Sequence, residues 1–340
     1  QSAGAEPGPA AYNQGGTKPT CTDANIVLGY INPDFFLGGR RTVDTSLSEK
    51  AIKQHIADPL GLSVPEAAHG IFRIINNNMV DAIRVVSVER GIDPRHYSLV
   101  SGGGAGNIHA GMLGSTLGMK QVLIPRYSGV FCSFGMIVSD VRHDHLKAFT
   151  ANTEKFDLDA VNEVIAELEK KAIDEMVEEG YPEGEVILKR FADAKYPAQI
   201  HELTVDVPSN KVLDEADIKV LENSFHDLHE QMFTYSVRES SVDIFHWRVV
   251  AYRSVKEPNS QIMEESSGAT EVAKKGTRNV YFGDINDYRN TQIYDGSSIQ
   301  HGMVIKGPAV VEETTTTIVI FPGQNLSVNR FGDFVLSLES

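Results

Sequence analysis

The sequence contains very little cysteine and has no long apolar run. Its 340 residues include only two cysteines, Cys21 and Cys132, too few for a disulfide framework or a zinc site of four thiolates. This usage is typical of a reducing compartment, so we expect a cytoplasmic protein. No stretch of about 18 consecutive apolar residues is present, so we expect no membrane partner.

Basic residues are scarce relative to acidic ones. The chain has 31 lysines and arginines against 46 aspartates and glutamates, a formal net charge of −15. Binding to the phosphate backbone of a nucleic acid requires a basic face, so this balance argues against a nucleic-acid partner. Hydrophobic residues make up 41% of the chain, enough for a sizeable core. At roughly 100–200 residues per domain, the length predicts two or three domains.

The chain also lacks an initiating methionine. It begins Gln1-Ser2-Ala3-Gly4, carries no signal-peptide pattern, and is rich in glycine, proline and alanine over residues 1–20. Two interpretations are open. The sequence is the later part of a longer polypeptide, or its first residues have been trimmed.

Hydrophobic periodicity and capping residues predict an α/β protein. A long helix begins after Ser63, with Pro65 in its first turn and Glu66 at the capping-box position, and ends at Gly91. A shorter helix from Thr45 or Ser46 is expected to break near Asp58-Pro59. Further helices are expected over residues 158–179 and 215–233, and strands over residues 186–194, 200–207, 243–252 and 314–321.

A run of glycines between a predicted strand and a predicted helix is the most informative segment. The strand candidate 97–100 is followed by Gly102-Gly103-Gly104-Ala105-Gly106, a helix of small residues and a strand at 121–125, which predicts a parallel α/β unit. Glycines let a ligand approach the backbone, and a helix N-terminus attracts anions, so the loop is a candidate nucleotide or phosphate site. A tight turn with close packing is the alternative. The spacing is neither a dinucleotide fingerprint nor a P-loop.

Four other patterns contain reactive side chains. His109 lies one turn into the helix after the glycines, where it is placed to contact a phosphate or a reacting oxygen, or to pack against a neighbouring helix. Cys132 is a candidate nucleophile, but its apolar neighbours and the lack of a basic group nearby favour a buried, inert thiol. His143-Asp144-His145 is a weak metal-ligand pattern on a predicted strand. His226 and His229 share a helix face and are interpreted as a surface pair.

A glycine pair near the N-terminus imitates a phosphate loop. Asn13-Gln14-Gly15-Gly16-Thr17 is similar to the Asp-x-Gly-Gly-Thr loop of actin-like ATPases. No strand precedes it, and asparagine replaces the aspartate that would hold Mg²⁺ through water. We therefore interpret it as an ordinary loop.

Several motifs, in their order along the chain, make the sequence resemble the hydantoinase A / 5-oxoprolinase family, which includes the matching subunits of acetone and acetophenone carboxylases. The motifs are Ser2-Ala3-Gly4-Ala5-Glu6-Pro7-Gly8-Pro9, Thr22-Asp23-Ala24-Asn25, Leu28-Gly29, Asn32-Pro33-Asp34-Phe35-Phe36-Leu37-Gly38-Gly39, Asp58-Pro59-Leu60-Gly61-Leu62-Ser63, Arg84-Val85-Val86-Ser87-Val88-Glu89-Arg90-Gly91, Gly103-Gly104-Ala105-Gly106 with His109-Ala110, Gly129 with Ser133-Phe134-Gly135, Asp140, Gly307-Pro308-Ala309-Val310-Val311-Glu312 and Pro322-Gly323.

The resemblance implies a fold and a division into domains. Members of this family have an actin-like ATPase core of two related halves. This chain resembles the second half, an α/β half-domain with an α+β extension over residues 1–256. A polar linker over 257–275 and a small β-rich C-terminal domain over 276–340 follow. The first half, with its own phosphate loop, has no counterpart here, so the expected partner is the N-terminal half of the same subunit.

The resemblance also implies a site. The loop Gly102, Gly103, Gly104, Ala105 and Gly106 becomes the adenosine-side loop of a nucleotide cleft, and Asp23 and Asn25 line that cleft. We assign Asn25 to cofactor binding with the loop, and Asp23 and His109 to catalysis. The implied cofactors are ATP and Mg²⁺ (or Mn²⁺), and no metal ligand is assigned within this chain.

The implied chemistry is ATP-dependent phosphorylation of a carbonyl oxygen, which proceeds mostly by positioning and charge neutralisation. One hypothesis is a ketone carboxylase that phosphorylates an enol and bicarbonate together with a hydantoinase B-like subunit. The alternatives are hydrolysis of a cyclic amide such as hydantoin or 5-oxoproline, and a non-catalytic scaffold. In each case we expect the isolated chain to be inactive.

Departures from the family pattern favour the ketone hypothesis. Asn107 stands where proline is common, and Pro197-Ala198-Gln199 replaces the usual Gly-Gln. Gln199, His201 and Glu202 are predicted on a strand, where they either face a substrate or partner subunit or are solvated.

Overall fold

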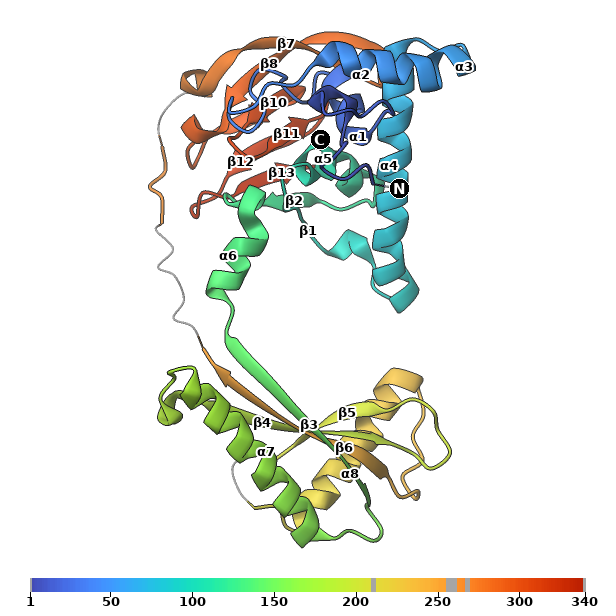
Figure 1. The fold of residues 1–340 in the computed structure, drawn as a ribbon, viewed down its shortest axis with the longest axis vertical. Helices are drawn as coiled ribbons and strands as arrows, with labels where there is room; N and C mark the ends of the chain where they lie inside the picture. The colour runs from blue at the N-terminus through green and yellow to red at the C-terminus, as the bar shows by residue number, and fades with distance from the viewer. Residues whose placement is uncertain (1, 209–211, 255–261, 267–269, 339–340) are drawn as a thin grey trace. The chain divides into compact units, whose positions relative to one another are not determined.

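The computed structural model describes residues 2–208, 212–254, 262–266 and 270–338. The chain forms two compact units, residues 1–137 with 259–340, and residues 138–258 (Figure 1). Both units combine helices with β-sheet, which confirms the predicted α/β class. Among the described residues, every helix is too short or too polar to cross a bilayer.

Helices of the first unit surround the segment that carries the glycine loop. They are α1 (Cys21–Val27), α2 (Thr45–Ile52), α3 (Asp58–Leu60), α4 (Val64–Val86), α5 (Gly106–Thr116) and α6 (Phe131–Val138), of which α6 reaches the boundary with the second unit. The predicted capping box of α4 is confirmed, because the Ser63 side chain accepts from the Glu66 amide and the Glu66 carboxylate accepts from the Ser63 amide. The α-helix itself ends at Val86, and a 3₁₀ turn over Val88–Arg90 continues the segment to the expected Gly91, whose φ is 76°.

The break expected at Asp58-Pro59 is wrong. A π-helical turn over residues 53–57 joins α2 to α3, and the helix continues through Pro59 to end at Gly61, whose φ is 66°. Within the π-helical turn the Asp58 N–H donates to the Lys53 carbonyl, five residues earlier, and Pro59, which has no N–H to donate, follows inside the continuous helix.

Two sheets complete the first unit. The five-stranded sheet has the order β1 (Leu99–Val100), β2 (Gln121–Ile124), β13 (Phe334–Ser337), β12 (Asn325–Val328), β9 (Val304–Lys306). The four-stranded sheet has the order β11 (Thr317–Ile320), β10 (Ala309–Glu312), β8 (Asp287–Asp295), β7 (Lys274–Phe282). β1 and β2 are parallel, which confirms the predicted strand, loop, helix, strand unit.

The structure divides the chain differently from the boundaries expected at 256 and 276. β13 pairs antiparallel with β2, with Phe334 opposite Ile124, so the C-terminal strands complete a sheet that begins more than 200 residues earlier. An independent core for residues 276–340 is therefore absent from the described fold. Part of the expected linker 257–275 lies outside the described residues; of the rest, 270–273 form a 3₁₀ turn and 274–275 begin β7.

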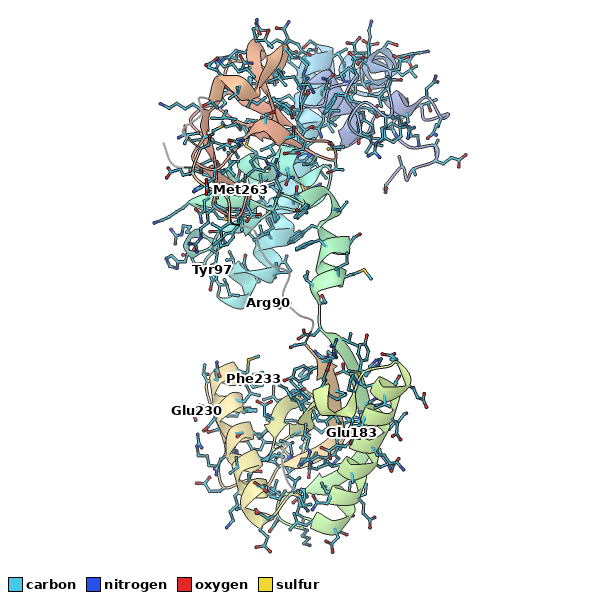
Figure 2. All side chains as sticks on the ribbon, turned by 90° about the vertical axis from the view of Figure 1, so that its left-hand side faces the viewer. Arg90, Tyr97, Glu183, Glu230, Phe233 and Met263 are labelled. Carbon is cyan, nitrogen blue, oxygen red and sulfur yellow. The ribbon has the colours of Figure 1, made fainter. Side chains whose placement is uncertain are left out.

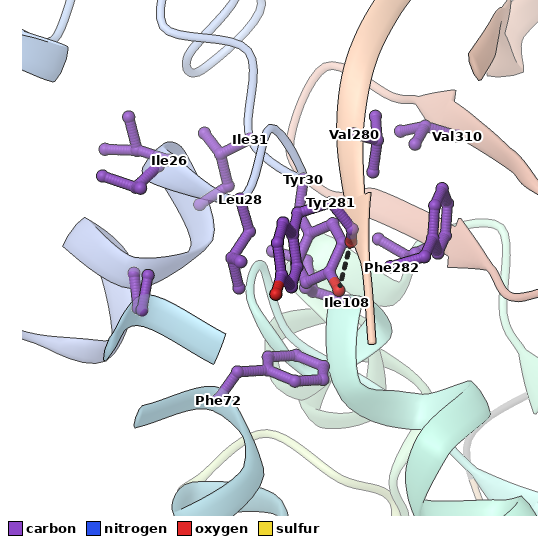
Figure 3. Packing of buried hydrophobic residues seen from close by; sticks show 14 of the residues in the cluster. Ile26, Leu28, Tyr30, Ile31, Phe72, Ile108, Val280, Tyr281, Phe282 and Val310 are labelled. Atoms are coloured by element: carbon purple, nitrogen blue, oxygen red, sulfur yellow. Dashed lines mark hydrogen bonds between the residues drawn. The ribbon is translucent and has the colours of Figure 1, made fainter. Parts of the chain in front are cut away.

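One apolar cluster joins α1, α4, α5 and the C-terminal strands. The Tyr30 ring lies 5.1 Å from the ring of Phe72 on α4, and its hydroxyl donates to the Tyr281 carbonyl on β7 at 3.1 Å (Figure 3). Ile108 of α5 and Phe282 are buried in the same cluster. Burial of these large side chains packs α5, and with it the glycine loop, against segments from the N-terminal part and from the C-terminal part of the unit.

The second unit is a four-stranded antiparallel sheet with two helices. Its order is β3 (Val141–Asn152), β6 (Asp243–Arg253), β4 (Ile187–Lys195), β5 (Leu203–Val207), and the helices are α7 (Leu158–Glu178) and α8 (Glu215–Phe233). Ala192, Val205 and Trp247, which lie on three different strands, pack in one core with both helices. The helices therefore cover one face of the sheet, and the intervening residues occupy the other.

The histidines of α8 are buried, so the predicted surface pair is wrong. His226 Nδ1 lies 2.6 Å from the Tyr196 hydroxyl, and His229 is bonded by Gln199 and by the Tyr235 carbonyl. The rings of Tyr196 and Tyr235 pack against His229. They cover this face of α8 toward the end of the helix, where Glu230 and Phe233 lie (Figure 2). Sequence periodicity on the helix alone does not reveal this cover.

Gln199, His201 and Glu202 lie in the turn before β5 and not on the strand itself, which begins at Leu203. Ala198 has a φ of 68°, a left-handed conformation that glycine adopts without strain. Ala198 thus adopts a backbone conformation that favours glycine, and Gln199 Nε2 lies 2.9 Å from His229 Nε2.

Candidate functional site

The glycine loop links β1 to the N-terminus of α5. Gly103 has a φ of 96°, and a Cβ built on it would meet no atom within 4 Å, so this residue borders open space. A Cβ on Gly104 would lie 3.1 Å from the Thr315 carbonyl oxygen, and one on Gly102 would lie 3.0 Å from the ring of Phe131. The loop is thus open at its middle and packed on both sides.

Asn107 holds the loop in this shape. Its side-chain oxygen accepts from the Ser101 hydroxyl at 2.6 Å, and its amide nitrogen donates to Ser128 Oγ at 2.9 Å and Thr316 Oγ1 at 3.0 Å. The Thr316 hydroxyl in turn donates to the Gly104 carbonyl at 2.9 Å. Because Asn107 is fully buried, this network rigidifies the loop at the point where a bound anion would require preorganised N–H groups.

Two cavities lie in the first unit. One, of about 240 Å³, is lined by Gly104 and Ala105 together with Thr22, Phe36 and the turn at residues 314–317. The other, of about 1100 Å³, lies between the N-terminal loop, the first residues of α1, and the Ile71 and Ile75 side of α4. The larger cavity has room for a nucleotide-sized ligand.

His109 and Asn25, both predicted site residues, lie together with Cys21. The His109 Nε2 atom is 3.3 Å from Asn25 Nδ2 and 3.6 Å from Cys21 Sγ, and the ring stacks on Phe72 at 4.8 Å. His109 Nδ1 and Asn25 Oδ1 are buried with no hydrogen-bond partner among the described residues. Burial lowers the pKa of His109 to about 4 and raises that of the Cys21 thiol, so both side chains are neutral at pH 7.

The depressed pKa of His109 predicts a loss of stability in acid. An imidazole in the unfolded chain binds a proton below its usual pKa of about 6.5, whereas the folded protein resists protonation until about pH 4. The free energy of unfolding should therefore fall by about 3 kcal/mol as the pH drops from 6.5 to 4. In a His109→Gln variant this part of the pH dependence should disappear in urea titrations. Equal pH profiles for the two proteins would contradict the assignment.

Asp23 is fully buried and fully bonded. Its Oδ1 accepts from the Ala11 amide at 2.9 Å and the Ser48 hydroxyl at 2.7 Å. Its Oδ2 accepts from the Ala10 amide at 3.2 Å and from the Thr20 amide and hydroxyl at 2.8 and 2.7 Å. Five donors saturate the roughly four lone-pair positions of a carboxylate, so the geometry favours a positioning role over the predicted catalytic one.

The remaining sequence candidates lie elsewhere. Cys132 is exposed and not buried as predicted, because α6 has no buried residue. The predicted loop Asn13 to Thr17 is confirmed. His143 and His145 share a face of β3 and lie 2.9 Å from carboxylate oxygens of Glu179, the C-cap residue of α7, and of Glu175 on that helix.

Sequence reasoning missed three residues of the site: Cys21, Thr20 and Thr316. Thr20 and Asp23 form a capping box at the start of α1, and their spacing, a threonine followed three residues later by an acid, is the local signal for it. No local signal identifies Thr316, since it reaches the loop from a turn 212 residues away in sequence.

Two protein-family models match consecutive parts of this chain. The family model described as Hydantoinase/oxoprolinase matches residues 1–145, and that of the Hydantoinase/oxoprolinase C-terminal domain matches residues 149–336. Among curated proteins, the caprolactamase subunit alpha of Pseudomonas jessenii is 35% identical over 99% of this chain and 49% of its own length. The acetophenone carboxylase gamma subunit of Aromatoleum aromaticum is 33% identical over 99% of this chain and 47% of its own length.

A solved structure shares the fold over the full chain. The ATP-dependent caprolactamase from Pseudomonas jessenii superposes with a TM-score of 0.80 at 34% identity, covering 100% of this chain and 50% of that chain. The chain thus spans about half the length of the relatives that it matches.

Proposed function

Because the chain belongs to the hydantoinase/oxoprolinase family, we propose that it is part of the ATP-binding subunit of an enzyme that activates a carbonyl group with ATP. The observation that carries the proposal is the structural similarity to an ATP-dependent caprolactamase, which extends over the whole chain and so includes the glycine loop. The second half of an actin-like ATPase core remains our proposed architecture. The N-terminal half of the same subunit would supply the opposite wall of the cleft and the phosphate loop.

Within this chain, we assign the nucleotide to the loop formed by Gly102, Gly103, Gly104, Ala105 and Gly106. The open space beside Gly103 and the rigid support from Asn107 favour close approach of a ligand to the backbone. Asn25, whose Oδ1 is buried with no hydrogen-bond partner among the described residues, would contribute a side-chain amide. Asp23 and His109, both buried, would position the α1 segment and α5.

Bound ATP with Mg²⁺ or Mn²⁺ would supply a phosphoryl group and neutralise its charge. Two carboxylates lie beside the loop cavity, but Glu312 is paired with Arg278 and Lys275 at 2.7 Å, and Glu313 faces Arg126 at 3.5 Å. Glu313 Oε1 is nevertheless buried with no hydrogen-bond partner among the described residues. We propose no metal ligand within this chain. Phosphorylation of the carbonyl oxygen makes it a better leaving group or fixes an enol as a nucleophile.

Two substrate classes fit this chemistry. Similarity to the caprolactamase subunit favours a cyclic amide, which would be hydrolysed. Similarity to the acetophenone carboxylase subunit favours a ketone, which would be carboxylated together with a hydantoinase B-like partner.

Parallel assays of the native enzyme separate the two classes. One assay supplies ATP, labelled bicarbonate and acetone or acetophenone, and the other supplies ATP with caprolactam, hydantoin or 5-oxoproline. We expect a labelled carboxylate in the first or a ring-opened acid in the second. Failure of both would overturn the proposal, as would ATP hydrolysis by the isolated 340-residue chain, since half a cleft should not hydrolyse ATP.

A further inference from the structure

The sheet of the second unit carries a cluster of polar side chains on the face opposite its helices. Asp193 of β4 is directly opposite His246 on β6 and Thr204 on β5, and Glu202 lies immediately before β5. Directly opposed residues on neighbouring strands point to the same face of a sheet. β4, β6 and the residue before β5 therefore bring two carboxylates and one imidazole to one place.

The donor atoms of this cluster are close together. One ligand atom each from Asp193, Glu202 and His246 lie within 4.8 Å of one another, and His246 Nδ1 is 3.4 Å from Glu202 Oε2. Asp193 is only 8% exposed, whereas the side chains of Glu202 and His246 are 31% and 34% exposed. Asp193 is thus buried, whereas Glu202 and His246 are accessible to solvent.

We propose that Asp193, Glu202 and His246 form a binding site for a divalent transition-metal cation such as Zn²⁺. Imidazole nitrogen and carboxylate oxygen are common zinc ligands, at about 2.0–2.2 Å from the ion. Because the side chains of Glu202 and His246 are partly exposed, small rotations suffice to bring their ligand atoms into contact with an ion beside Asp193. Three protein ligands leave at least one coordination position for water or an oxygen ligand.

Neighbouring groups hold the buried ligand in place. The Thr204 hydroxyl donates to Asp193 Oδ1 at 2.6 Å, and Arg248 Nη2 lies 3.1 Å from Asp193 Oδ2. Each oxygen has about two lone pairs, so both retain one for a metal. Such outer contacts orient ligating carboxylates in metal sites. The alternative is an ion-pair network of Asp193 with Arg248 and Glu202 with His246, which needs no metal.

Titration of the metal-free 340-residue chain with ZnCl₂ in a calorimeter tests the site, and CoCl₂ absorption reports on the ligand set. We expect one Zn²⁺ per chain, and binding at least about tenfold weaker in His246→Ala and in Glu202→Gln. The visible Co²⁺ bands should be lost in His246→Ala. Circular dichroism and thermal unfolding without metal confirm that each variant is folded.

His143→Ala is the matched control, because His143 and His145 also lie beside two carboxylates, on β3 and α7. It should leave Zn²⁺ binding unchanged. Absence of binding to the wild-type chain would overturn the site in favour of the ion-pair network. Full binding by a His246→Ala/Glu202→Gln double variant, or loss of binding in His143→Ala, would place the metal elsewhere and equally overturn it.

Discussion

Replacing Asp23 by asparagine is expected to lower the free energy of unfolding by about 3–5 kcal/mol, the usual cost of breaking a buried charged network. The carboxylate accepts five hydrogen bonds, including those from the Ala10 and Ala11 amides and the Ser48 hydroxyl. An amide group has only one oxygen, so it would leave some of these buried donors unpaired and would set its own NH₂ against others. Urea unfolding followed by circular dichroism measures the difference.

Asp34→Asn provides the matched control, because Asp34 is exposed and the same chemical change there should alter stability by less than about 0.5 kcal/mol. Similar small effects at both positions would show that Asp23 does not hold the α1 segment. The hydrogen bonds of this carboxylate would then not explain its burial.

A valine at Gly104 is expected to weaken ATP binding by the native enzyme by roughly tenfold to a hundredfold, since overpacking costs about 1–3 kcal/mol. The Cβ of the valine would lie 3.1 Å from the Thr315 carbonyl oxygen. Its two methyl groups would therefore push the glycine loop away from the turn that carries Thr316. That movement breaks the bond between the Thr316 hydroxyl and the Gly104 carbonyl and changes the wall of the adjoining cavity. Calorimetric titration with ATP reports the change.

The control for this substitution is Gly184→Val, at a glycine where an added Cβ meets no atom within 4 Å. It should bind ATP with the affinity of the unmodified enzyme. If Gly104→Val remains folded by thermal unfolding and binds ATP equally well, the nucleotide does not use this loop.

Local signals in the sequence were sufficient for the elements that position the loop. The capping box at Ser63 and Glu66 located α4, and helical periodicity located α7 and α8. The glycines after a short apolar strand identified the β1, α5 and β2 unit. In each case the deciding interactions are made within a few residues, where spacing and capping chemistry are readable.

Long-range pairing was not predictable by the same reasoning. Nothing in the periodicity of β2 indicates that its second neighbour is β13, so a separate C-terminal domain was expected where one sheet is formed. For the same reason, the burial of His226 and His229 depends on Tyr196 and Tyr235, which reach α8 from other segments.

The contacts around the predicted site residues cannot be read from sequence spacing. The loop, Asn25 and His109 lie in one region of the first unit, yet the stacking of His109 on Phe72 and the saturation of Asp23 come from residues that sequence spacing does not connect. These contacts explain why two residues predicted as catalytic are better placed to position their helices.

ATP-dependent activation of a carbonyl group is tested most directly by measuring phosphate release and product formation together in the native enzyme, with and without the carbonyl substrate. We predict that product forms only with ATP, and that phosphate release rises on addition of the ketone or cyclic amide that is turned over. Product formation at the same rate without ATP would contradict the proposed function.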